Sequence, residues 1–111
     1  MLTLHPEEQT WLEKYRKALK ERHRGAVLRM VIYGSKARGD AHQDSDIDVL
    51  IIVKNEANGL KRPLRRIGYD LAATSWAVPS IMAYTQAEWE RLATLQSTFR
   101  EAVERDGVPV L

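Results

Sequence analysis

Apolar and polar positions along the chain change their spacing several times, and each change marks an expected element. Pro6 is followed by apolar residues spaced three and four apart, and Gly25 follows the last of them. This spacing is typical of an amphipathic helix, and glycine is a common stop. We therefore predict a helix from about residue 6 to residue 23, with an apolar stripe of Trp11, Leu12, Tyr15, Ala18 and Leu19.

Three short runs rich in apolar and β-branched residues are expected to be strands, at 26–33, 47–53 and 77–84. The run 47–53 is apolar on both faces, which is typical of a central strand. Pro79 lacks an N–H group and favours an edge position for the third run.

The remaining segments are expected to be helices and connections. The residues 54–59 are polar and predict a loop, whereas Leu60, Leu64, Ile67 and Leu71 predict an amphipathic helix. Thr85 and Glu88 form a capping box ahead of another helix. A last short helix should stop at Gly107, followed by an extended tail. The order of elements indicates a small α/β sheet covered by helices, and the 111 residues suffice for a single domain, 1–111.

Composition and charge add limits to this picture. The chain has no cysteine, so disulfides and thiolate metal sites are excluded. No apolar run reaches the roughly 20 residues of a membrane span, and no signal peptide precedes the first helix, so we expect a cytoplasmic protein without a membrane partner. The net charge of +2 gives no reason to expect direct nucleic-acid binding.

Two surface features allow more than one interpretation. Basic residues cluster at 14–24 and 61–66, either as solvated helix faces or as a docking surface for phosphates or an acidic partner. We interpret Trp11, Trp76 and Trp89 as core or interface aromatics rather than platforms on which bases stack.

The candidate chemistry lies between residues 33 and 53. Asp46 and Asp48 are separated by one residue at the start of the central strand, so they should project to the same face, roughly 7 Å apart along the backbone. Two carboxylates so placed repel each other unless a cation lies between them. Mg²⁺ or Mn²⁺ suits such oxygen ligands and commonly bridges them to phosphates.

A phosphate-binding turn is expected just before this pair. Gly34 allows close approach to a ligand, and the Ser35 hydroxyl and exposed N–H groups can hold phosphate oxygens. Lys36 and Arg38 bring positive charge to the same place.

The combination of apolar strand, Gly34-Ser35, ten intervening residues, Asp46-x-Asp48 and apolar strand resembles the signature of the DNA polymerase β-like nucleotidyltransferases. The short chain is most similar to the minimal nucleotidyltransferases that accompany HEPN-domain toxins in toxin–antitoxin systems. The resemblance implies a mixed three- to four-stranded sheet flanked by helices, and transfer of AMP from Mg-ATP to an acceptor hydroxyl. It implies that Asp46 and Asp48 are catalytic metal ligands, and that Gly34, Ser35, Lys36 and Arg38 bind nucleotide.

The chain departs from this family at one position. The family's third carboxylate comes from the next strand, but no Asp or Glu lies between Leu71 and Ala87. The expected position holds Ser80 or Pro79. Three outcomes are possible: Asp70 or Asp44 replaces the missing acid, only one metal binds well, or catalysis is reduced.

Two functions are therefore expected as alternatives. The chain is either an antitoxin enzyme that adenylylates a hydroxyl of a HEPN ribonuclease toxin, with tyrosine as the acceptor that the resemblance suggests, or a nucleotide-binding antitoxin that neutralises this partner by contact alone.

Overall fold

The computed structural model describes residues 2–42 and 45–111. Its helices and strands alternate along the chain as the apolar pattern predicts. In chain order they are α1 (Pro6–Arg22), β1 (Val27–Tyr33), α2 (Gly34–Arg38), β2 (Ile47–Val53), the 3-10 helix η1 (Asn55–Leu60), α3 (Lys61–Ala72), β3 (Pro79–Thr85), α4 (Gln86–Thr94), α5 (Thr98–Asp106) and β4 (Val108–Pro109).

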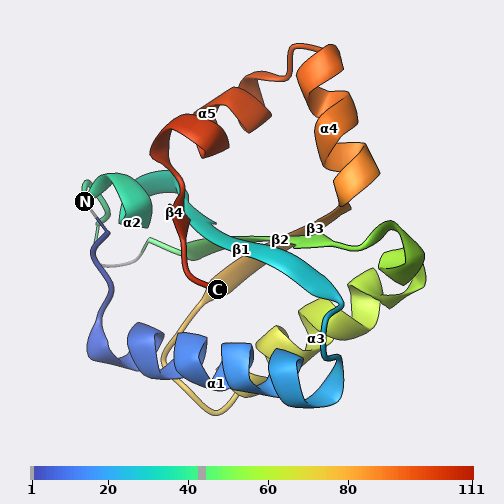
Figure 1. The fold of residues 1–111 in the computed structure, drawn as a ribbon. Helices are drawn as coiled ribbons and strands as arrows, with labels where there is room; N and C mark the ends of the chain where they lie inside the picture. Colours follow the sequence, from blue (N-terminus) through green and yellow to red (C-terminus); the bar gives the residue numbers. More distant parts are fainter. Residues whose placement is uncertain (1, 43–44) are drawn as a thin grey trace.

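The strands form one mixed sheet in the order β3-β2-β1-β4 (Figure 1). β2 is parallel to β3 and antiparallel to β1, while β4 pairs with β1 in the antiparallel sense. Because β2 has a strand on each side and helices over both faces, its residues from Val49 to Val53 are all buried. This confirms the predicted α/β class, the mixed sheet, the central position of 47–53 and the edge position of the third strand.

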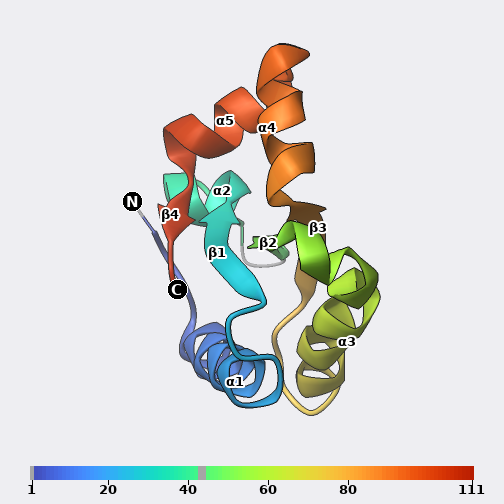
Figure 2. The same ribbon diagram turned by 45° about the vertical axis from the view of Figure 1, so that its right-hand side comes forward.

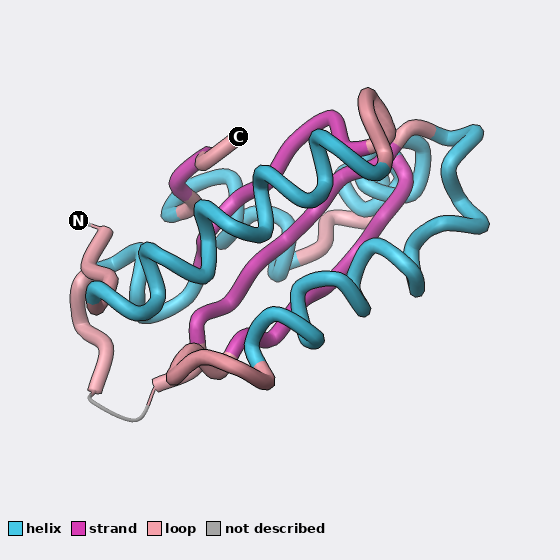
Figure 3. The backbone as a smooth tube through the Cα atoms, turned by 90° about the horizontal axis from the view of Figure 1, so that it is seen from below, coloured by secondary structure: helices cyan, strands magenta, loops and turns pink. Residues whose placement is uncertain are grey.

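Helices cover both faces of the sheet. α1 and α3 lie side by side across one face, and α4 and α5 cover the other (Figures 2 and 3). Alternate residues of β2 serve the two layers: Val49 and Ile51 pack against α1 and α3, whereas Leu50 and Ile52 pack with Trp89 and Val103.

Two side-chain hydrogen bonds join α1 to α3. Trp11 Nε1 donates to the Gly68 carbonyl at 2.8 Å, and the Tyr15 hydroxyl donates to the Leu64 carbonyl at 2.8 Å. Both carbonyls belong to a buried helix face, so these bonds satisfy acceptors as well as the two aromatic donors. These two bonds hold α1 and α3 together as one layer against the sheet.

The free edge of β3 offers few backbone donors. Pro79 has no N–H group, the Ile81 N–H donates to the Tyr69 hydroxyl at 2.9 Å, and the Thr85 N–H donates to Glu88 at 2.8 Å. The last of these bonds belongs to the predicted capping box, in which Glu88 N–H also donates to the Thr85 hydroxyl.

The predicted loop at 54–59 is wrong, because Asn55–Leu60 form the 3-10 helix η1. The Ala57 N–H donates to the Lys54 carbonyl, and the Ala57 side chain is buried. Trp11 and Trp89 are buried as predicted, but Trp76 is 87% exposed and is not a core residue. Within the described residues, no helix combines the length and apolar character needed to cross a membrane.

Candidate active site

Asp46 and Asp48 lie at the start of β2, where the sheet meets α2. Ile47 and Val49 point into the layer of α1 and α3, so the alternation of the strand directs Asp48 to the opposite face. Burial raises the pKa of the Asp48 carboxyl, the charge of Asp46 raises it further, and Arg38 lowers it. The two carboxylates are thus close enough to repel each other, and as hard oxygen ligands they fit a divalent cation.

Gly34 joins the end of β1 to α2 and packs directly against Asp48. Its φ is +73°, in the left-handed region that favours glycine. A Cβ atom placed on Gly34 would overlap Asp48 Oδ2. Glycine therefore allows the backbone before Ser35 to approach the carboxylate of the neighbouring strand.

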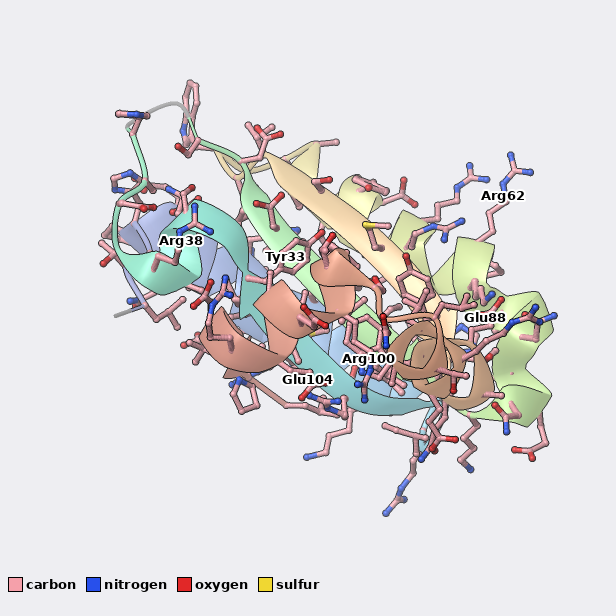
Figure 4. The ribbon with its side chains drawn as sticks, turned by 90° about the horizontal axis from the view of Figure 1, so that it is seen from above. Tyr33, Arg38, Arg62, Glu88, Arg100 and Glu104 are labelled. Carbon is pink, nitrogen blue, oxygen red and sulfur yellow. The ribbon has the colours of Figure 1, made fainter. Side chains whose placement is uncertain are left out.

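α2 continues the turn with two of the predicted nucleotide-binding residues. Ser35 is half-buried at the first turn, and Arg38 is exposed with its Nε 3.2 Å from Asp40 Oδ2. Gly39 ends the helix with φ +83°, and its N–H donates to the Ser35 carbonyl. Figure 4 shows Arg38 on α2 and Tyr33 beside it, at the end of the sheet opposite to Arg62. The charge of Arg38 acts on Asp48, so both lie within one site.

Lys36 has a different position from the one its charge suggested. Its side chain is 2% exposed, and its Nζ lies 3.1 Å from Oε1 of Glu8, which is itself 7% exposed. Glu8 also accepts the His5 N–H, and the Thr3 N–H donates to the Lys36 carbonyl. Lys36 thus ties α2 to the start of α1, and its ammonium is turned away from solvent, which argues against direct contact with phosphate.

Glu8 was not predicted from the sequence to be a buried ion-pair residue, although its position along the chain indicates burial. It lies three and four residues before Trp11 and Leu12, so it belongs to the apolar stripe of α1. A carboxylate on a buried stripe requires a positive partner.

The position expected for a third carboxylate is occupied by Ser80. In the parallel register of β2 and β3, Asp48 is opposite Ser80 and Ile47 is opposite Pro79. Among residues 2–42 and 45–111, no group of three or more His, Cys, Asp or Glu side chains could hold a metal ion. Asp70 is exposed on α3, beside Arg66 and on the other face of the sheet from Asp48. The other predicted substitute, Asp44, lies outside the described residues.

Tyr33 lies opposite Asp48 on the other neighbouring strand. Burial, with a smaller contribution from Asp48, raises the pKa of its hydroxyl to about 12. Its ring contacts Phe99 of α5 edge to face, with 5.4 Å between centroids. Tyr33 therefore remains a protonated donor beside the carboxylates at neutral pH.

A hollow of about 540 Å³ adjoins Asp46 at the same end of the sheet. Its lining includes Glu7 and Asp46 together with the exposed Trp76. The hollow shares Asp46 with the candidate site, but Gly34, Ser35 and Asp48 do not line it.

Comparisons with known proteins identify the family to which this fold belongs. The family model of the nucleotidyltransferase domain matches residues 12–103. A relative from Methanocaldococcus jannaschii named "Putative protein adenylyltransferase" is 28% identical over 99 residues, which are 89% of this chain and 94% of the relative. Another of the same name and organism is 40% identical over 45 residues, covering 40% of this chain and less than half, 45%, of the relative.

Solved structures are similar over nearly the whole chain. One described as a "putative minimal nucleotidyltransferase" superposes with a TM-score of 0.59 at 25% identity, covering 92% of this chain and 94% of the other. Another, described as a "putative nucleotidyltransferase from Sulfolobus solfataricus", gives a TM-score of 0.53 at 16% identity, covering 98% of this chain and 89% of the other, and supports the fold. With the family model matching most of its length, the chain belongs to the nucleotidyltransferase domain family.

Proposed function

We propose that the chain transfers AMP from Mg-ATP to a hydroxyl of a partner protein. The observation that carries the proposal is the packing of Gly34 against Asp48, which brings a phosphate-binding turn next to a carboxylate with a raised pKa. Relatives named as protein adenylyltransferases support AMP as the group and a protein as the acceptor.

The roles of the residues follow from their positions. Asp46 and Asp48 would hold the divalent cation, which when bound supplies positive charge for the triphosphate and the leaving group. The Ser35 hydroxyl and Arg38 would bind phosphate oxygens, while Lys36 and Glu8 hold α2 in place. The acceptor oxygen bonds to the α-phosphorus of ATP and loses its proton to solvent, while the bond from that phosphorus to the α–β bridging oxygen breaks and this oxygen leaves with pyrophosphate.

The acceptor that we propose is a tyrosine of a HEPN-domain toxin, which would make the chain an antitoxin. The resemblance of the motif between Gly34 and Asp48 to toxin-associated minimal transferases supports this partner. The described residues form one sheet, and all residues of the candidate site lie on or next to it. A hydroxyl on a separate protein is consistent with this arrangement.

One observation favours a second candidate function. Ser80 is neutral and lies where the resemblance calls for a third carboxylate. With fewer carboxylates the site would hold a second cation weakly, so the chain would bind metal-nucleotide and neutralise its partner by contact without transfer.

The deciding experiment is incubation with isotopically labelled ATP, Mg²⁺ and the protein encoded beside this chain, followed by intact mass spectrometry. The enzyme predicts a gain of AMP units on the partner, and this gain should disappear in the variant Asp46→Asn/Asp48→Asn. Stable complex formation without any mass gain would overturn the enzyme and support neutralisation by contact.

A further inference from the structure

Three arginines and a tyrosine line a hollow on the outer surface of α3. The hollow has a volume of about 380 Å³ and is lined by Arg62, Arg65, Arg66 and Tyr69. These residues are spaced three, four and seven apart, so they share one face of the helix. We refer to this set as the arginine hollow.

The charges of the arginine hollow are poorly neutralised within the described part of the chain. Arg62 and Arg65 form no ion pair with any described residue, and Arg66 reaches only Asp70, at 3.8 Å between two largely exposed side chains. Some other basic residues have closer acidic partners, as Lys61 has in Glu88 and Arg29 in Glu104. Like charges on one helix face destabilise it, so an anionic ligand would relieve a repulsion that the fold leaves in place.

One end of the arginine hollow, at Tyr69, contacts the edge strand next to the candidate active site. The Tyr69 hydroxyl accepts the N–H of Ile81, whose neighbour Ser80 lies opposite Asp48. Tyr69 also contributes to the raised pKa of Tyr33, the other strand neighbour of Asp48. From Tyr69 to Arg62 the helix rises roughly 10 Å, a distance that about three residues of an extended chain would span. Arg62 at the far end extends into solvent (Figure 4).

Exposed apolar side chains lie along the same edge of the molecule. Met82 of β3, Trp76 and Val78 just before it, and Tyr69 of α3 are all exposed. Aromatic, methionine and arginine side chains together are typical of protein interfaces, whereas single-stranded RNA would stack its bases on the aromatic side chains and has no comparable use for Met82 and Val78. The mixture therefore favours an acidic protein over an RNA.

We propose that the arginine hollow and the adjoining edge of β3 dock the acceptor protein through an acidic segment close to the hydroxyl that receives AMP. The proposal rests on the proposed function, because it assigns the partner of the same site. Side-chain contacts would carry this docking, since Pro79 and the bonded N–H of Ile81 leave little backbone for strand addition.

The first test measures binding of a fluorescent octaglutamate peptide by anisotropy at low salt. The variant Arg62→Ala/Arg65→Ala should weaken binding by at least about tenfold. The matched control Lys14→Ala/Lys20→Ala removes the same charge from α1 and should change it by less than about twofold. An equal loss in both variants would overturn the proposal. So would an RNA octamer that binds more tightly than the peptide with the same dependence on the arginines.

The second test separates this proposal from the proposed function. In the AMP-transfer assay with the neighbouring protein, the arginine variant should raise the KM for the acceptor and leave kcat and the KM for ATP nearly unchanged. Transfer with an unchanged acceptor KM would refute the docking surface and leave the enzyme standing. Arginine-dependent binding of octaglutamate without transfer by the wild type would refute the enzyme and leave the acidic docking surface standing.

Discussion

The backbone of Gly34 and the carboxylate of Asp48 pack against each other so closely that no side chain fits between them. Gly34 directly follows β1 and Asp48 lies near the start of the central strand β2, so the contact joins the proposed phosphate-binding turn to the proposed metal ligand. The arrangement depends on glycine twice, for its positive φ and for its missing Cβ.

Replacing Gly34 should therefore damage both folding and binding. Gly34→Ala is expected to cost about 1–3 kcal/mol of unfolding free energy, because alanine at this φ is strained and its Cβ displaces Asp48. Urea denaturation measures this cost, and calorimetry with Mg-ATP should show no binding. Gly59→Ala is the control, because a Cβ there meets nothing within 4 Å. Equal effects of the two substitutions would contradict the packing described here.

The raised pKa of Asp48 predicts a conflict between stability and binding. A carboxyl with a folded-state pKa above its unfolded value contributes stability at low pH, and that stability is lost as the pH rises from about 4 through the folded pKa. Asp48→Asn should thus stabilise the metal-free protein at pH 7 by up to about 1 kcal/mol, a small amount because water screens this half-buried group. Thermal melts from pH 4 to 8 would show the variant becoming more stable than the wild type only once the pH has risen through the folded-state pKa of Asp48. A variant less stable than wild type at pH 7 would disprove the repulsion.

Ser80→Asp should make stability depend more strongly on divalent cations. The added carboxylate would face Asp48 across neighbouring strands, about 4.8 Å apart. Without metal, three clustered charges should lower the melting temperature, and Mg²⁺ should restore it with higher affinity than in the wild type. Thr74→Asp, in the exposed turn after α3, adds the same charge elsewhere and should lack this dependence. If both variants respond to Mg²⁺ as the wild type does, Ser80 does not face the site.

The buried pair of Lys36 and Glu8 should be worth far more than an exposed pair. Lys36→Met leaves a buried carboxylate without its partner and should cost about 3–5 kcal/mol, and Glu8→Gln should cost a similar amount. Glu8→Gln/Lys36→Met should recover much of the loss. Lys17→Met breaks the exposed pair with Glu21 and should cost less than about 1 kcal/mol. Denaturation of the four variants completes the test, and strict additivity of the two buried substitutions would show that the pair does not interact.

The sequence was most informative where local pattern and tertiary environment agree. The run 47–53 is apolar throughout because β2 is covered on both faces, and Thr85 caps α4 through contacts only three residues away. The resemblance left Ser80 or Pro79 at the position of the third carboxylate, and the register of β2 and β3 pairs Ser80 with Asp48.

Other features depend on the tertiary environment of a residue and could not be predicted from the sequence. The charge of Lys36 suggested a phosphate ligand, and only the folded chain brings Glu8 to it from 28 positions away. The sequence alone predicts that Trp76 is a core or interface aromatic; it precedes an edge strand and is exposed, so it is not a core residue, and the interface alternative stays a prediction. The polar residues 54–59 gave no sign that Ala57 is buried under a tight helical turn.

The hydrogen bond from Ile81 to the Tyr69 hydroxyl bears on how the protein behaves when it is concentrated. An exposed edge strand is a template on which identical molecules can stack into fibrils. On β3, proline withholds one donor, a phenol occupies the next, and the capping glutamate occupies the N–H of Thr85. These contacts hinder growth of the sheet from one molecule into another at the β3 edge, and a single phenolic oxygen on α3 provides part of that protection.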